Sequence, residues 1–241
     1  MQNFRFDYLD DGQISASVSL WRDRLREDGD GVLSVCRSLA EWEETMEAPL
    51  ACATRIAEIL QSLLRAIGGA LEDLPRPTGI FASEGDKKRS YGVTCRFLLR
   101  LERSQKELRR EDGYLSSLLP KIGEKRISRL RAKGELMAIL EAAKAENRAD
   151  VCAFCQRSLL SVEEQMASNE EDLRQIEALQ GHLRTWCNDA VGAFFGRVSA
   201  LADLEHEGAG ASPMRLSELF GELRHTAEQT IEKINTYVRR S

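Results

Sequence analysis

The chain has 241 residues, of which 42% are hydrophobic and 30% charged, a composition typical of globular proteins built from amphipathic helices. With five prolines, 6% aromatic residues and few runs of β-branched residues, the sequence argues against a β-rich fold. The formal net charge of −5 argues against a dedicated nucleic-acid binder, which usually has a basic surface.

The start of the sequence and its cysteines indicate a cytoplasmic protein. No apolar run follows a basic start, so we expect no signal peptide. No stretch approaches the roughly eighteen consecutive apolar residues of a membrane span. The cysteines stand at positions 36, 52, 95, 152, 155 and 187, and we expect most of them to be reduced, buried thiols.

The chain opens with an expected N-terminal extension over residues 1–12, and a first helical region follows over residues 13–74. The helical pattern is interrupted at Asp28–Gly31, a turn signal, and at Pro49, which predicts a kink or a new helix start. Beyond this proline, apolar residues alternate at spacings of three and four, which is typical of a coiled-coil seam. The seam consists of Ala53, Ile56, Leu60, Leu63, Ile67, Ala70 and Leu74.

A loop is expected over residues 75–88, because continuing a helix through its two prolines costs free energy. The second helical region then runs to about Ala145, and we expect a kink or short break between residues 112 and 122, around Pro120. Its expected inner face consists of Tyr91, Thr94, Leu98, Leu101, Gln105, Leu108, Ile127, Leu130, Met137 and Leu140.

The third helical region follows a tight reversal at residues 147–150, where Asp150 is expected to cap the next helix. Asn169 and Gln180 are polar residues on its heptad seam, and such residues usually set the register or the number of partners. The seam runs through Leu159, Val162, Met166, Asn169, Leu173, Ile176, Gln180, Leu183, Cys187, Ala190, Phe194 and Leu201.

A second loop is expected over residues 205–212, and Ser212-Pro213 is a start signal for the last helix. The pattern as a whole predicts an all-α fold, with residues 13–241 in one elongated bundle. This bundle has three long, kinked, antiparallel helical regions plus the C-terminal helix, packed in the manner of a coiled coil. Because a slender bundle exposes much surface, part of its seam is expected to meet a second chain.

Three local patterns resemble functional sites, and each has a simpler interpretation. Cys152 and Cys155 form a CxxC pair, but zinc needs four ligands and the sequence has no second pair. Asp28–Gly31 suggests a calcium loop, but arginines stand where the first and last carboxylates belong. His225 is expected to be exposed, like most polar residues on a helix surface. We therefore predict no catalytic residue, metal site or cofactor.

A basic stripe suggests a partner. It consists of Lys121, Lys125, Arg126, Arg129, Arg131 and Lys133. Like charges four residues apart repel each other by a few tenths of a kcal/mol, so an acidic partner is expected. The candidates are the chain's own Glu163, Glu164, Glu170 and Glu171, another subunit, a phospholipid surface and a nucleic-acid backbone.

The leading functional hypothesis is a non-enzymatic scaffold, adaptor or assembly subunit that acts through helix–helix interactions. Its partner would be another protein or a second copy of the chain. A second hypothesis is a BAR-like peripheral membrane-surface binder that uses the basic stripe, a likeness of architecture without a supporting motif. A third is a phosphorelay or thiol module that uses His225 or the CxxC pair.

Overall fold

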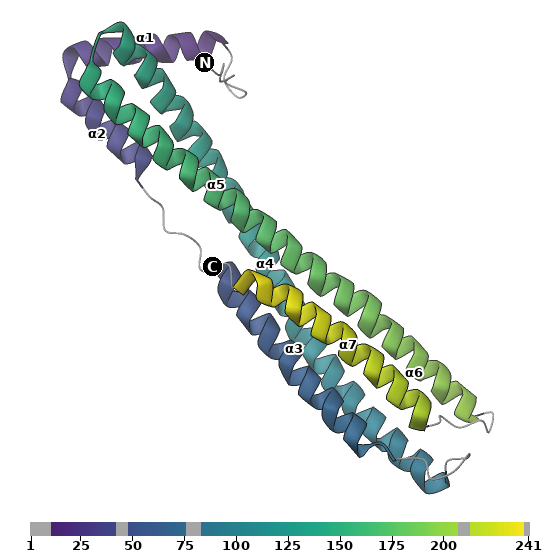
Figure 1. Cartoon of the computed structure of the whole chain (residues 1–241). Coiled ribbons are helices and arrows are strands. Elements are labelled where there is room, and N and C mark those ends of the chain that lie inside the picture. The colour runs from purple at the N-terminus through teal and green to yellow at the C-terminus, as the bar shows by residue number, and fades with distance from the viewer. Residues whose placement is uncertain (1–10, 42–47, 76–82, 207–212, 239–241) are drawn as a thin grey trace. The chain divides into compact units, whose positions relative to one another are not determined.

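The computed structural model describes residues 11–41, 48–75, 83–206 and 213–238, and every regular element within them is helical (Figure 1). This confirms the predicted all-α class. Of the predicted extension over residues 1–12, residues 1–10 lie outside the described part, and residues 11–12 belong to the first helix. The elements are α1 (Asp11–Glu27), α2 (Gly29–Ala40), α3 (Ala48–Asp73), α4 (Glu84–Ala145), α5 (Ala149–Thr185), the π-helical η1 (Trp186–Ala190), α6 (Val191–His206) and α7 (Pro213–Val238).

The chain divides into two compact units, each assembled from segments that are distant in sequence. Unit 1 comprises residues 1–46 and 119–173, and unit 2 comprises residues 47–118 and 174–241. Both α4 and α5 contribute to both units. The prediction of one bundle over residues 13–241 did not anticipate this division.

Unit 1 is built by α1, α2, the later part of α4 and the earlier part of α5. Trp21 of α1 also donates a hydrogen bond to the carboxylate of Glu135 on α4, 2.8 Å away. The core of unit 1 consists of Trp21, Leu25, Val32, Cys36, Ala132, Leu136, Ala138, Ile139, Ala142, Ala143, Val151, Cys155 and Val162. The four segments therefore share one apolar core.

The break between α1 and α2 is the turn that the sequence predicted at residues 28–31. Asp28 is the N-cap of α2, and its carboxylate accepts a hydrogen bond from the backbone N–H of Gly31 at 2.9 Å. The carboxylate thus stabilises a helix start. A Cβ at position 29 would lie about 2.5 Å from the guanidinium of Arg148, so a larger residue there would displace the end of that side chain from the turn.

The reversal between α4 and α5 is also where the sequence placed it. Asn147 has a positive φ of 56°, and the backbone N–H groups of Asn147 and Arg148 donate to the carbonyls of Lys144 and Ala143. This is a Schellman motif. Asp150 is not the N-cap residue, because α5 begins one residue earlier, but its carboxylate does accept a hydrogen bond from the backbone N–H of Val151 in the first turn. It also pairs with Arg148 at 2.9 Å.

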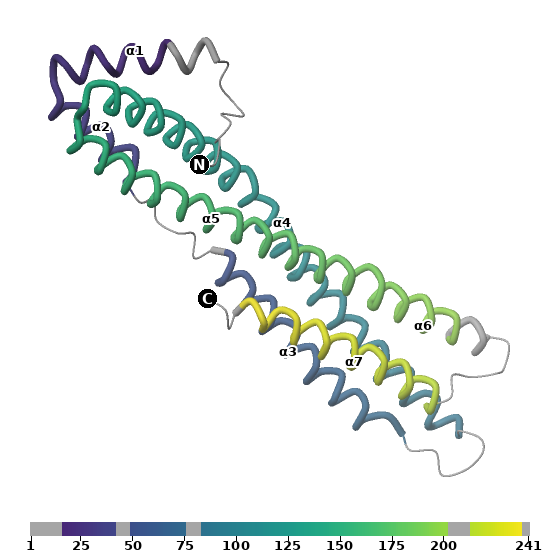
Figure 2. The backbone as a smooth tube through the Cα atoms, turned by 45° about the horizontal axis from the view of Figure 1, so that its top comes forward, coloured from purple at the N-terminus to yellow at the C-terminus, as the bar shows by residue number. Residues whose placement is uncertain are grey.

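Unit 2 consists of α3, the earlier part of α4, the segment from the end of α5 through α6, and α7, which lie side by side in Figures 1 and 2. All seven residues of the predicted seam, six in α3 and Leu74 directly after it, are at most 7% exposed, which confirms that prediction. Phe97 of α4 packs edge to face against Phe194 of α6 and Phe220 of α7, with ring centroids 5.7 and 4.8 Å away. These rings join three helices of the core.

Both helix starts that contain proline agree with the sequence prediction. Pro49 lies in the first turn of α3, and Pro213 is the first residue of α7. The predicted loop at 75–88 is too long, because α4 begins at Glu84. There Ser83 and Asp86 form a reciprocal cap, in which Asp86 N–H donates to the Ser83 hydroxyl and Ser83 N–H donates to the Asp86 carboxylate.

Of the kink or short break predicted around Pro120, the break is absent, because α4 is helical from Glu84 to Ala145. A proline inside a helix costs about 3 kcal/mol. Burial on either side outweighs this cost, since Leu115, Leu118 and Ile122 are all at most 2% exposed.

The predicted inner face of α4 is partly wrong. Tyr91 and Ile127 are 59% and 53% exposed, and Val93, Phe97 and Leu136 are buried instead. In η1, the π-helical geometry shifts the inner face by one residue, so Val191 is buried and Ala190 is only half-buried.

Candidate interaction surfaces

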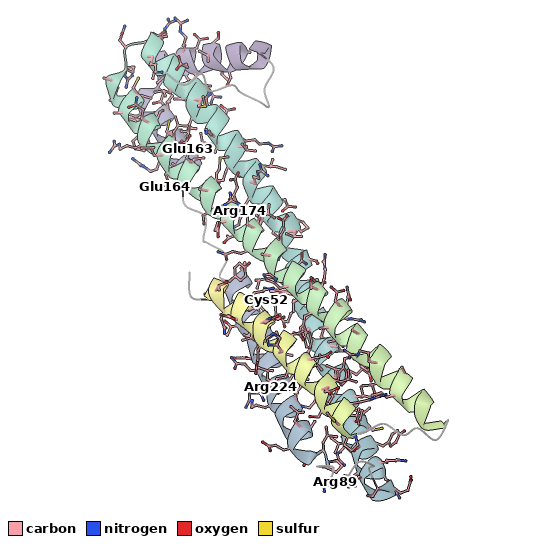
Figure 3. All side chains as sticks on the ribbon, turned by 45° about the vertical axis from the view of Figure 1, so that its right-hand side comes forward. Cys52, Arg89, Glu163, Glu164, Arg174 and Arg224 are labelled. Atoms are coloured by element: carbon pink, nitrogen blue, oxygen red, sulfur yellow. The ribbon has the colours of Figure 1, made fainter. Side chains whose placement is uncertain are left out.

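The basic stripe lies on α4 in unit 1, and several of its cations contact α5 of the same unit. Lys133 Nζ is 2.7 Å from a carboxylate oxygen of Glu163, and Arg126 is 4.0 Å from Glu170. Figure 3 labels Glu163 and its neighbour Glu164 on α5. The basic stripe therefore forms ion pairs with the chain's own glutamates, which were one of its four candidate partners.

Arg129 is the stripe residue that sequence reasoning misplaced. Its side chain is buried, with 7% of the residue exposed, and Nη1 donates to the side-chain oxygen of Gln165 on α5 at 3.0 Å. The same nitrogen donates to the carbonyl of Glu41, just beyond α2, at 3.1 Å. Arg129 thus ties three segments of unit 1 together, which is a structural role.

The other stripe residues are more accessible. Lys121, Arg126 and Arg131 are exposed, and Lys125 is half-buried. A shallow hollow of about 480 Å³ lies between α2 and α4 of unit 1, and Arg131 shares its lining with the exposed Ile127 and two carboxylates, Glu124 and Glu135. Because its charges are mixed, the hollow favours no single class of ligand.

The two polar residues of the predicted seam differ in their surroundings. Gln180 of α5 is buried in unit 2, and its amide donates to the hydroxyl of Ser116 at 2.7 Å and to the carbonyl of Asp112 at 3.2 Å. It therefore acts within its own unit. Asn169 is half-buried in unit 1.

One cysteine of the CxxC pair contacts a third thiol in unit 1. Cys155 Sγ lies 3.4 Å from Cys36 Sγ of α2, and both residues are fully buried, whereas Cys152 is half-buried. The hydrogen bond from Cys155 lowers the pKa of Cys36, and the same contact together with burial raises the pKa of Cys155. Sequence reasoning missed Cys36 as a partner, because only the fold brings α2 against α5.

Another buried thiol, that of Cys52, lies near the start of α3 in unit 2 (Figure 3). It donates to the carboxylate of Glu111 on α4 at 3.0 Å, and the same carboxylate accepts from Arg55 at 2.9 Å. Burial and the contact with Glu111 raise the pKa of Cys52 to about 12. The thiol is therefore protonated at neutral pH and a poor nucleophile.

Two further expectations concern histidine and metal. His225 of α7 is exposed, as predicted, and its Nε2 accepts a hydrogen bond from the Gln229 amide on the same helix at 2.9 Å. Across the described ranges, His, Cys, Asp and Glu side chains form no group of three or more suited to hold a metal ion. Among the helices described, none has a stretch long and apolar enough to cross a bilayer.

A basic surface that sequence reasoning missed lies on the earlier part of α4, in unit 2. Between positions 88 and 110 there are eight cations and two carboxylates, Glu102 and Glu107, and all eight cations are exposed. We name this surface the arginine face. It consists of Lys88, Arg89, Arg96, Arg100, Arg103, Lys106, Arg109 and Arg110.

Four members of the arginine face recur every seven residues, so they lie on one side of the helix with a drift of only about 20° per step. They are Arg89, Arg96, Arg103 and Arg110, and Figure 3 labels Arg89 in the first turns of α4. At 1.5 Å per residue, the row is about 32 Å long. This seven-residue spacing is visible in the sequence, so the arginine face could have been identified without the structure.

The arginine face makes few contacts within its own unit. Arg96 is 4.0 Å from Asp73, Lys106 pairs with Glu102 at 2.9 Å, and Arg100 donates to the hydroxyl of Ser62 at 3.2 Å. Within the described ranges, Arg89, Arg103 and Arg110 form no ion pair.

A shallow hollow of about 380 Å³ opens on the arginine face, between α3 and α4 of unit 2. Arg96, Arg100 and Arg103 converge on it, and Leu99, which is 59% exposed, lies beside them. Ser62, Ser104 and Glu107 complete the lining. Three guanidinium groups around one hollow form a site that favours anions.

Comparisons of the chain with profiles of known protein families, with curated proteins and with solved structures found no match.

Proposed function

We propose that the chain is a non-enzymatic interaction protein, a scaffold or adaptor that acts through exposed helix faces. The arginine face of unit 2 is its main docking surface, and the partner carries negative charge. The observation that carries this proposal is the exposure of eight cations, against two carboxylates, between positions 88 and 110 of a chain with a net charge of −5.

The energetics of the isolated helix support this assignment. Arg96 and Arg100 are four residues apart, and Arg100 and Arg103 are three apart, so each pair repels by a few tenths of a kcal/mol. Arg100 and Arg103 form no ion pair within the described part of unit 2, so the repulsion between them is not offset there. An anionic partner would turn the repulsion into attraction.

The basic stripe of unit 1 supports a partner less strongly than the arginine face does. Its most buried member, Arg129, serves the fold, and Lys133 and Arg126 face glutamates of α5. We therefore expect charge reversal in the stripe to affect external binding less than the same reversal on the arginine face.

Retention on an immobilised polyanion such as heparin tests the proposal. One variant carries Arg96→Glu, Arg103→Glu and Arg110→Glu. Its matched control carries Lys121→Glu, Arg126→Glu and Arg131→Glu, which changes the net charge by the same amount at exposed positions of the stripe.

We expect the wild type to be retained at low salt and the control to elute close to it, whereas the arginine-face variant flows through. A wild type that is not retained would overturn the proposal, as would an equal loss of retention in both variants. In the latter case total charge, and not the arginine face, would explain binding.

A further inference from the structure

We infer that the partner of the arginine face is an anionic phospholipid surface. The inference rests on the proposed function, which assigns this face to docking. It names the partner from the arrangement of charged and apolar side chains on the earlier part of α4.

The row of arginines matches the charge of such a surface. Arg89, Arg96, Arg103 and Arg110 are about 10.5 Å apart along the helix, so each can meet a separate headgroup. Guanidinium groups bind phosphate oxygens through two parallel hydrogen bonds. The negative charge elsewhere on the chain weakens this attraction little, because charges more than about 8 Å away are screened at physiological salt.

An exposed leucine decides between a lipid surface and other polyanions. Leu99 is three residues after Arg96 and four before Arg103, so the two arginines flank it on the same helix face. It is 59% exposed. Among the cations that bind lipid phosphates, its side chain can enter the boundary between headgroups and acyl chains. A nucleic-acid backbone offers phosphates but no such apolar layer.

The hollow beside Leu99 gives the inference a second support. Arg96 and Arg103 line it from α4, and the hydroxyl of Ser62 lines it from α3. This set can hold one phosphate-bearing headgroup while the neighbouring arginines bind adjacent lipids. Glu107, also on the lining, would repel the headgroup, and its replacement by Gln should strengthen binding a few fold.

A second copy of the chain is a weaker candidate for the same face. The acidic residues that could meet the arginine row include Glu163 and Glu170 of α5, and these lie within 2.7 and 4.0 Å of Lys133 and Arg126 of their own unit. Docking a second copy there would exchange existing ion pairs for new ones, with little net gain.

The test uses the full chain and sedimentation with large vesicles of phosphatidylcholine, either pure or containing phosphatidylserine. We expect binding to the mixed vesicles alone, and binding that weakens steeply with added salt. Each cation near an anionic leaflet raises binding by roughly fivefold, so the arginine-face variant should bind at least about 100-fold more weakly. The matched stripe variant should bind like the wild type.

Leu99→Ser separates lipid binding from plain charge attraction. We expect it to weaken vesicle binding by about five- to tenfold and to leave heparin retention unchanged, because only the lipid surface receives the leucine. A circular dichroism melt checks that each variant is folded.

If the wild type fails to bind phosphatidylserine vesicles at low salt, the inference is wrong. Retention on heparin that still depends on the arginine face would then leave the proposed function standing. Tighter binding to duplex DNA or to poly-glutamate than to vesicles would also overturn the inference, and would assign the face to a nucleic-acid backbone or an acidic protein.

Discussion

Arg129 of α4 and Gln165 of α5 meet inside unit 1, where a guanidinium nitrogen donates to the amide oxygen at 3.0 Å and both residues are at most 7% exposed. The same nitrogen also bonds the carbonyl of Glu41 at 3.1 Å. A residue that reads as part of a surface stripe in the sequence therefore connects three segments of the fold.

Replacing Arg129 by Met should lower the free energy of unfolding by about 2–4 kcal/mol, because the buried side-chain oxygen of Gln165 and the carbonyl of Glu41 lose a charged donor. Lys121→Met, at an exposed position of the same stripe, should change it by less than about 0.5 kcal/mol. Urea denaturation followed by circular dichroism measures both values. Equal, small losses in the two variants would show that Arg129 is not a structural residue.

Oxidation should join Cys36 to Cys155, because their sulfur atoms are already 3.4 Å apart in the core of unit 1. Diamide treatment followed by peptide mapping should find this disulfide in the wild type and in Cys152→Ser. A bridge across so many residues should stabilise the protein by about 2–4 kcal/mol. A disulfide between Cys152 and Cys155 as the main product would favour the CxxC interpretation instead.

The Arg55–Glu111 pair of unit 2 should give the stability of the protein a specific pH dependence. Burial acts to raise the pKa of Glu111, but the hydrogen bonds from Arg55 and Cys52 outweigh it, and the pKa lies below its ordinary value of 4.5. A carboxyl group with a lowered pKa stabilises the fold above its unfolded pKa, and this stabilisation is lost as the pH falls through the folded pKa.

Arg55→Met should therefore reduce stability by about 1 kcal/mol at pH 7, and by progressively less as the pH falls below about 4.5. The quantity to compare is the difference in unfolding free energy between the wild type and the variant, because the other carboxyl groups titrate alike in both. Denaturation at a series of pH values measures it. A difference that stays constant down to the acid limit would contradict the assigned pKa shift.

Self-association remains a prediction of the heptad seam, and Asn169 and Gln180 allow it to be tested separately from folding. Gln180 bonds Ser116 and Asp112 of its own unit, so Gln180→Leu should cost about 1–2 kcal/mol of stability. Asn169→Leu should change the assembly state with less effect on stability, because seam polar residues select register and stoichiometry. Sedimentation velocity at micromolar concentration reports the assembly state. A stable monomer in both the wild type and Asn169→Leu would refute the seam hypothesis.

The parts of the fold that follow local rules were predictable from the sequence. The seam of α3, the reversal at residues 147–150 and the proline at the start of α7 depend on side-chain spacing and backbone preferences within a few residues. Each of these features could be predicted without knowing which segment packs against it.

The misplaced features depend on contacts between distant segments. Arg129 is buried because α2 and α5 supply acceptors at its position, and Cys36 reaches Cys155 only in the folded chain. The buried residues of α4 follow one register with alternating spacings of four and three through both units, and Tyr91 and Ile127 lie off it. The register was hard to find because polar residues such as Ser90, Ser104 and Arg129 occupy some of its buried positions.

The arginine face was missed for a different reason. Its spacing of seven residues is present in the sequence, but two carboxylates and several apolar residues interrupt the run of charge. The basic stripe has a higher local density of cations, so it is the more conspicuous basic segment of the sequence. Only the exposure of the side chains shows which of the two basic surfaces makes few contacts within the fold.

Arginine-selective chemical labelling with peptide mapping tests the central claim most directly, because it reports which guanidinium groups an anionic partner covers. The full chain is labelled with a dicarbonyl reagent, free and saturated with heparin. We expect the partner to protect Arg89, Arg96, Arg103 and Arg110 and to leave the exposed Arg157 and Arg224 labelled as before. Protection confined to Arg126 and Arg131 of the basic stripe, or no protection at any arginine, would contradict the account.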